Sequence, residues 1–418
     1  MERPLDGLER RFWLLGRAVS VNVVATARVR GVLHQRDVRA ALDGAQARHP
    51  RLRLRIDDGP PPRFVGGAPA LPLRLVARVG AEAWRPVAEE ELGLSFSSGP
   101  LLRATLVRGA GASELILTCH HAIGDAFALF ALTGELLRAV AGEPPGPPHD
   151  DEPALSALLP AGERGLAGRV AFLREAQRLA IEAKRVRAEG LRREQDAPPA
   201  ARRSRIVQRS LAAPATEALA VRARHERTTV QGALAAAALC AVRGDTGRDL
   251  GLGCQQAVNL GTRLSRPAPG AFGVYAVGVP TYHQVGAQEF WELARETQAA
   301  LELLLQRRTP LLTPAYLEGT IPRDAAAAVD AVNHADRLEL AAVAVSNLGR
   351  IDAVPLPGLS WETFHFGAAV TLGSVLMLAA TTFRGVLTCN FITPDPLVGP
   401  TRADGLADAA MVALRSAP

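Results

Sequence analysis

Residues 117–129 read LTCHHAIGDAFAL and place two adjacent histidines and an aspartate between a strand-like run and a helix-like run. In an extended strand neighbouring side chains point to opposite faces, so only one of His120 and His121 can enter a given cleft. Asp125 directly precedes the helical run and suits its N-cap. The histidines are therefore expected beside a helix N-terminus, which favours the neutral imidazole that a general base requires.

Other catalytic patterns are weaker or missing. A pair of structural histidines in a strand-to-helix turn is the alternative to a catalytic pair. A Cys-His hydrolase using Cys119 is disfavoured because adjacent strand residues diverge. The sequence has no G-x-S-x-G, P-loop or H-E-x-x-H motif, and its four cysteines show no CxxC or metal spacing and need not be paired. We therefore expect no metal.

Composition describes a globular chain. Its 418 residues indicate two domains, and it is 48% hydrophobic and 22% charged. The net charge is +6, and nearly all of the positively charged residues are arginines, Lys184 being the single lysine. Aromatic residues make up 5% and do not interleave with the basic ones, so no nucleic-acid partner is expected.

A cytoplasmic protein is expected. The opening MERPLDGLERRFW contains acids and no apolar core, unlike a signal peptide. Residues 366–383 have the length of a membrane span, but their glycines and β-branched residues favour buried strands, followed by a turn at Arg384-Gly385. No membrane span is therefore predicted.

Strand-like and helix-like segments alternate throughout and predict a mixed α/β fold. The best linker is DAPPAARRS, residues 196–204. It divides the chain into an N-terminal lobe, residues 1–195, which carries the histidine motif, and a C-terminal lobe, residues 206–418. A cleft between the two lobes is the expected site.

A long amphipathic helix is expected at residues 163–195, just before the linker. Its arginines predict a solvated face, with a membrane-surface or RNA-binding helix as the alternative. The opposite face is predicted to pack through four apolar residues, Leu166, Val170, Leu173 and Ile181.

HHAIGDA, residues 120–126, resembles the HHxxxDG signature of the chloramphenicol-acetyltransferase-like superfamily. This superfamily includes peptide-synthetase condensation domains, plant BAHD acyltransferases, and stand-alone bacterial polyketide-associated and alcohol acyltransferases. Four other segments are similar to it, the last two to the stand-alone bacterial enzymes: ALDGAQARHPRLRLRI (41–56), CQQAVNLGTRL (254–264), VSNLGRID (345–352) and ATTFRGVLTCNFITPDPLV (380–398). The plant DFGWG sequence is missing from residues 271–278, which argues against the plant branch.

The resemblance implies two lobes with a cleft or tunnel between them and an acyltransferase without an acyl-enzyme. His121 would be the base that takes a proton from a hydroxyl or amine acceptor as it attacks an acyl thioester, and would then protonate the leaving thiolate. The donor would be a coenzyme A or carrier-protein phosphopantetheine thioester, which is a substrate, and no cofactor is expected. An ester or amide product in secondary metabolite or lipid biosynthesis is implied.

Supporting roles follow from the same resemblance. His120 and Asp125 would be mainly structural, with Gly124 and Asn259 beside them. The donors to the oxyanion would come from the loop amides after His121, including Ala126, or from the side chains of Ser346 and Asn347.

Two departures from the family pattern bear on these roles. Ala126 stands where glycine usually follows the aspartate, and Gly261 stands where the family often has an arginine facing it. Arg263, two residues further along an extended chain, is predicted to pair with Asp125 instead. The departures also motivate alternatives: a catalytically silent carrier-protein docking module, or an unusual cyclisation or dehydration on a carrier-bound intermediate.

Overall fold

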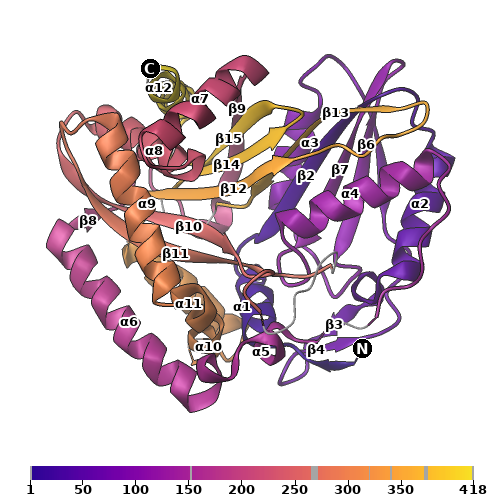
Figure 1. The fold of residues 1–418 in the computed structure, drawn as a ribbon. Helices are drawn as coiled ribbons and strands as arrows, with labels where there is room; N and C mark the ends of the chain where they lie inside the picture. The colour runs from indigo at the N-terminus through magenta and orange to yellow at the C-terminus, as the bar shows by residue number, and fades with distance from the viewer. Residues whose placement is uncertain are drawn as a thin grey trace.

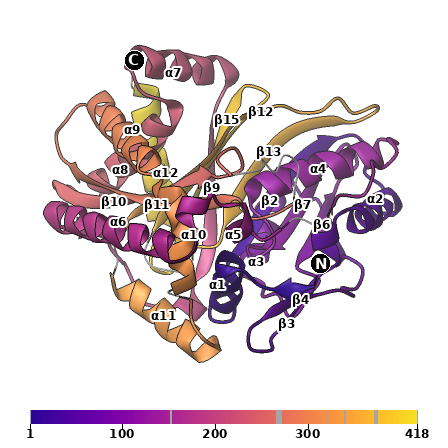
Figure 2. The ribbon, with the colours of Figure 1, turned by 60° about the horizontal axis from the view of Figure 1, so that its bottom comes forward.

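The computed structural model describes residues 2–150, 153–264, 272–319, 321–338, 341–370 and 375–416. The chain forms two lobes of mixed α/β structure that lie side by side, as Figure 1 and Figure 2 show. The predicted fold class is confirmed.

The first lobe is built on a five-stranded sheet in the order β13-β2-β7-β6-β5. Its strands are β2 (Asn22–Arg30), β5 (Leu73–Ala77), β6 (Leu102–Arg108), β7 (Ala112–His120) and β13 (Ser360–Ala368). Its helices are α1 (Gly7–Gly16), α2 (Gln35–Arg48), α3 (Trp84–Gly93) and α4 (Ala126–Val140), and a small sheet joins β1 (Arg3–Pro4), β4 (Arg63–Val65) and β3 (Arg55–Asp57). Helix α4 packs on β2, β7 and β13 and is covered by α2.

The second lobe is built on a larger sheet in the order β11-β10-β12-β14-β15-β9, with β8 beside β10. Its strands are β8 (Ala188–Glu189), β9 (Arg203–Leu211), β10 (Leu250–Asn259), β11 (Ala276–Val285), β12 (Val343–Ile351), β14 (Leu376–Phe383) and β15 (Val386–Asp395). The remaining helices are α5 (Leu155–Leu158), α6 (Gly165–Val186), α7 (Ala213–His225), α8 (Val230–Thr246), α9 (Phe290–Gln306), α10 (Thr309–Gly319), α11 (Ala325–Leu338) and α12 (Pro400–Ser416). Helix α8 lies between α9 and α12 and packs on the sheet.

The stretch at 366–383, which has the length of a membrane span, covers the end of β13 and all of β14. The turn to β15 is at Arg384-Gly385, where both residues have positive φ, 51° and 80°. Such turns match the twist of a β-hairpin, so the sequence-based prediction of strands and a turn is confirmed. Among the helices in the described ranges, none is both long and apolar enough to cross a membrane.

Two segments cross the predicted boundary between lobes. Strand β13 belongs to the C-terminal half of the chain but pairs antiparallel with β2 in the first sheet. Helix α6 precedes the linker but packs on β11 and α10, and β8 after it pairs with β10 of the second sheet. The division at residues 195 and 206 stays a prediction, but the lobes exchange these segments.

The prediction for the long helix is wrong in two respects. Helix α6 ends at Val186 because Arg187 adopts the left-handed conformation, with φ of 53°. The face that packs is lined by Phe172, Leu179 and Ala183, whereas the apolar residues expected to pack are exposed. The helix has apolar residues on two sides, and the sequence does not show which side the second lobe covers.

Candidate active site

His120 is the last residue of β7 and is buried in the first lobe. Its Nδ1 accepts a hydrogen bond of 3.1 Å from the Ala122 amide, and its ring lies 5.3 Å from that of Trp13. A Cβ atom on Gly16 would clash with Nε2, so glycine makes room for the ring. Burial lowers the pKa of His120 to about 3. His120 is therefore neutral and packed inside the first lobe, and its mainly structural role stays a prediction.

His121 points to the other side and lines the cavity between the lobes. Its ring stacks on Phe12 at 4.1 Å and 12°. Its Nδ1 lies 3.1 Å from the Gly124 carbonyl oxygen, which only accepts, so Nδ1 carries the proton and Nε2 keeps its lone pair. Burial lowers the pKa of His121 to about 4 and keeps the ring neutral near pH 7. This is the state of a general base.

Asp125 caps α4 and also joins the two lobes. Its Oδ1 accepts a hydrogen bond of 3.0 Å from the Ala128 amide, which confirms the predicted N-cap. Its Oδ2 accepts hydrogen bonds from the amides of Tyr275, at 2.8 Å, and Ala276, at 3.1 Å, where β11 begins. Complete burial raises the pKa of Asp125, while these amides favour the carboxylate and oppose the rise.

The predicted contact between Asp125 and Arg263 is wrong. Arg263 is exposed in the turn at 261–264, and no ion pair joins these two residues, both of which the structure describes. The prediction assumed an extended chain after Asn259. Instead β10 ends there, and the Asn259 Oδ1 accepts a 2.8 Å hydrogen bond from the Gly261 amide in a turn. The link to the second lobe exists, but backbone amides make it.

Gly124 and Ala126 are explained by space and by helix geometry. A Cβ on Gly124 would lie 3.0 Å from the Phe272 ring and 3.3 Å from the Cys119 Sγ, so the turn needs glycine for room. Ala126 is the first residue of α4 and does not have a positive φ, so its side chain is tolerated there. Burial raises the pKa of the Cys119 thiol far above its usual range, which excludes it as a thiolate nucleophile near pH 7.

The cavity has a volume of about 1080 Å³ and is lined mainly by apolar side chains. It is bounded by α1, the histidine turn, α6, and strands β10, β11, β12 and β13. His121, Asp125 and Ala126 line it together with Asn259, Ser346 and Asn347. The structure thus brings together most of the predicted site residues, although they come from distant parts of the sequence.

Donors for an oxyanion are fewer than predicted. The amides of Ala122 and Ile123 are already hydrogen-bonded to His120. Ser346 and Asn347 line the cavity where the pairing of β12 with β14 becomes irregular. The Asn347 Oδ1 accepts from the Gly349 amide at 2.8 Å, which leaves the Nδ2 group as a donor.

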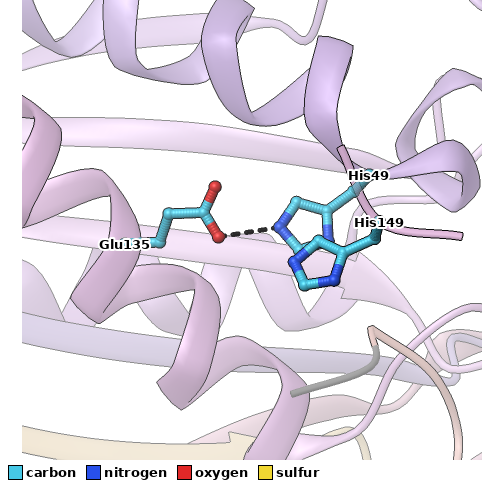
Figure 3. Close-up of side chains that lie close together, drawn as sticks. All are labelled: His49, Glu135 and His149. Atoms are coloured by element: carbon cyan, nitrogen blue, oxygen red, sulfur yellow. Dashed lines mark hydrogen bonds and ion pairs between the residues drawn. The ribbon is translucent and has the colours of Figure 1, made fainter. Parts of the chain in front are cut away.

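Sequence reasoning missed a cluster beside this site, drawn in Figure 3. The His49 Nε2 lies 2.8 Å from Glu135 Oε2, and the His149 ring stacks on that of His49 at 4.5 Å. Their ligand atoms lie within 4.8 Å of one another, close enough for a metal ion. However, the Arg48 guanidinium also pairs with Glu135, at 3.1 Å, and the two rings are stacked. These contacts describe an ion-paired network, and the signal for it was the histidine of the ARHP stretch.

Residues 200–391 match the family described as the phthiocerol/phthiodiolone dimycocerosyl transferase C-terminus. A search of curated protein sequences finds no match.

Several solved structures share the whole fold. Trichothecene 15-O-acetyltransferase from Fusarium sporotrichioides superposes with a TM-score of 0.77 at 14% identity, covering 100% of this chain and 95% of that one. Polyketide synthase associated protein 5 from Mycobacterium tuberculosis gives 0.67 at 16% identity, covering 99% and 98%. The condensation domain of the monacolin K polyketide synthase gives 0.66 at 13% identity, covering 100% and 97%.

Proposed function

The chain has the fold of the chloramphenicol-acetyltransferase-like superfamily, and from this premise we propose that it transfers an acyl group from a thioester to a hydroxyl or amine. One observation carries the proposal. His121 lines the cavity between the lobes with its Nδ1 proton donated to the Gly124 carbonyl, so Nε2 is available as a base.

The proposed reaction needs one base and no covalent enzyme intermediate. The His121 Nε2 removes the proton from the acceptor O–H or N–H as that atom attacks the thioester carbonyl. The oxyanion that forms receives hydrogen bonds from Ser346 or Asn347. When the C–S bond breaks, the Nε2–H returns the proton to the leaving thiolate, so the enzyme ends in its starting state.

The cavity also suggests the chemistry of the donor. Its apolar lining suits a hydrophobic acyl chain. Three cations, Arg11, Lys184 and Arg187, line it as well, and they would attract the phosphate groups of coenzyme A or of a carrier-bound phosphopantetheine arm. We propose such a thioester as the donor and an alcohol or amine as the acceptor.

Ala126 and Gly261 depart from the family pattern and motivated the alternative of a silent docking module. The structure compensates for both departures. Without the family's arginine, Asp125 is still satisfied by amides from both lobes. With alanine at position 126, α4 still begins normally. The oriented His121 therefore favours catalysis over a purely docking role. A cyclisation or dehydration on a carrier-bound substrate would use the same base.

The test is a thiol-release assay on the purified chain. Acyl-coenzyme A thioesters of increasing chain length, and the same acyl groups on phosphopantetheinylated carrier protein, are mixed with alcohol or amine acceptors. We expect acceptor-dependent release of free thiol, with the ester or amide product identified by mass spectrometry. No turnover with any combination, together with carrier binding that His121→Ala leaves unchanged, would instead support the docking module.

A further inference from the structure

Helix α6 carries an aliphatic stripe on the side that faces away from the second lobe. Leu166, Val170, Leu173 and Ile181 are 79%, 39%, 62% and 59% exposed. Their spacings of four, three and eight residues place them on one side of the helix. Scattered exposed apolar residues need no explanation, but an aligned series along one helix marks an interaction surface.

The stripe is flanked by positive charge. Arg169, Arg174, Arg178, Lys184 and Arg185 are exposed on α6. The two glutamates of the helix lie off the stripe. Glu175 is buried, accepts from the Thr309 hydroxyl at 3.0 Å and pairs with Arg178 at 3.0 Å, and Glu182 is partly buried, 4.0 Å from Arg307. On the outer face of α6, every residue of which is described, cations flank the aliphatic groups, and the half-exposed Glu182 is the one acid of the helix that reaches solvent.

The same helix borders the cavity. Phe172 and Leu179 on its inner face line the cavity, and so do Lys184 and Arg187 near its C-terminal end, which are exposed to solvent. Leu338 of α11, 48% exposed, lines it too. The cavity therefore opens to solvent beside the end of the stripe at Ile181.

We propose that the outer face of α6 docks this protein on a bilayer that contains anionic lipid. Aliphatic residues flanked by arginine and lysine are the pattern of a helix that lies in the membrane interface, where the long cationic side chains reach the headgroups. A protein partner is less favoured, since the cores of protein interfaces are enriched in aromatic residues, and this face has none. Docking places the cavity mouth at the membrane, where an apolar substrate would be concentrated. The docking itself does not rest on the proposed acyl transfer.

The test is sedimentation of the full chain with vesicles. Phosphatidylcholine vesicles with and without phosphatidylglycerol, an anionic lipid, are compared at low and high salt. We expect binding only to the anionic vesicles, weakened by salt. A variant with Leu166→Ser, Leu173→Ser and Ile181→Ser should bind roughly 10-fold or more weakly, since apolar burial is lost. Arg174→Gln with Arg185→Gln should weaken binding severalfold.

The matched control replaces two exposed valines elsewhere, Val79→Ser and Val412→Ser, and should bind like the unaltered protein. Thermal melting of each variant shows that the chain is folded. Failure of the folded, unaltered chain to bind anionic vesicles would overturn the proposal. The proposal would also be overturned if the triple variant bound vesicles as well as the unaltered protein does and lost self-association or carrier-protein binding instead.

Discussion

The two lobes contribute different chemistry to one cavity. The first lobe supplies the imidazole and the carboxylate, His121 and Asp125, from a single turn after β7. In the described ranges, β10, β11 and β12 of the second lobe supply amides, hydroxyls and apolar side chains to the cavity, without a carboxylate, imidazole or cation. The proposed proton-transferring group is therefore set by local sequence, and the second lobe completes the cavity around it.

The difference shows why Asp125 does not need a cationic partner. An ion pair buried between the two lobes would have to offset the free-energy cost of removing two charges from water. Two amides at the start of β11 instead solvate one carboxylate and are themselves satisfied by it. This arrangement depends on the backbone of the second lobe and leaves no mark in the side-chain sequence.

The largest expected effect is the loss of the base. His121→Ala should lower acyl transfer roughly 100-fold or more with the fold retained, because proton removal from the acceptor is lost. Added imidazole should restore part of the rate. His120→Ala is the matched control, and its main effect should be a lower melting temperature, because its ring packs beside Trp13. A folded His121→Ala protein with full activity would exclude this mechanism.

The arrangement of the histidine motif was predictable because it depends on residues that are close together in the sequence. Strand alternation separated His120 from His121, and capping propensity placed Asp125 at the start of α4. The partner of Asp125 and the packed side of α6 depend on contacts between residues far apart in the chain, for example Asp125 with Tyr275. They could not be read from spacing, and both predictions were wrong.

The next effect concerns the link between the lobes. Asp125→Ala should lower stability by about 1–3 kcal/mol and activity by about 10-fold or more, because three amides, two of them buried, lose their acceptor. Arg263→Ala would be equally damaging if the predicted pairing with Asp125 existed, but it should change stability by less than about 0.5 kcal/mol, since the residue is exposed. Thermal melting and initial rates of both single variants and of the double variant decide whether amides or an arginine stabilise Asp125. Equal losses in the single variants that do not add in the double variant would show that the ion pair forms.

A smaller effect should come from the turn that orients the base. Gly124→Ala puts a methyl group 3.0 Å from the Phe272 ring, which must move by a few tenths of an ångström. We expect a loss of about 1 kcal/mol in stability. We also expect a severalfold lower kcat, because the Gly124 carbonyl accepts the hydrogen bond from the His121 Nδ1–H that orients the ring. Phe272→Leu should recover part of the loss in the double variant. Strictly additive effects on kcat would show that Phe272 is not what the methyl group meets.

The smallest effect is expected from mild acid, and it separates the buried base from an ordinary histidine. A base is active when neutral, so activity is present above its pKa and is lost as the pH falls through it. Because burial lowers the pKa of His121 to about 4, about nine-tenths of the protein should keep a neutral base at pH 5. An exposed histidine with the usual pKa of about 6.5 would be almost fully protonated there. The measurement is kcat/KM from pH 4 to 8, with circular dichroism at each pH to confirm that the chain stays folded. An acid limb near pH 6.5 in the folded protein would mean that solvent reaches His121 freely and that the two lobes do not shield it.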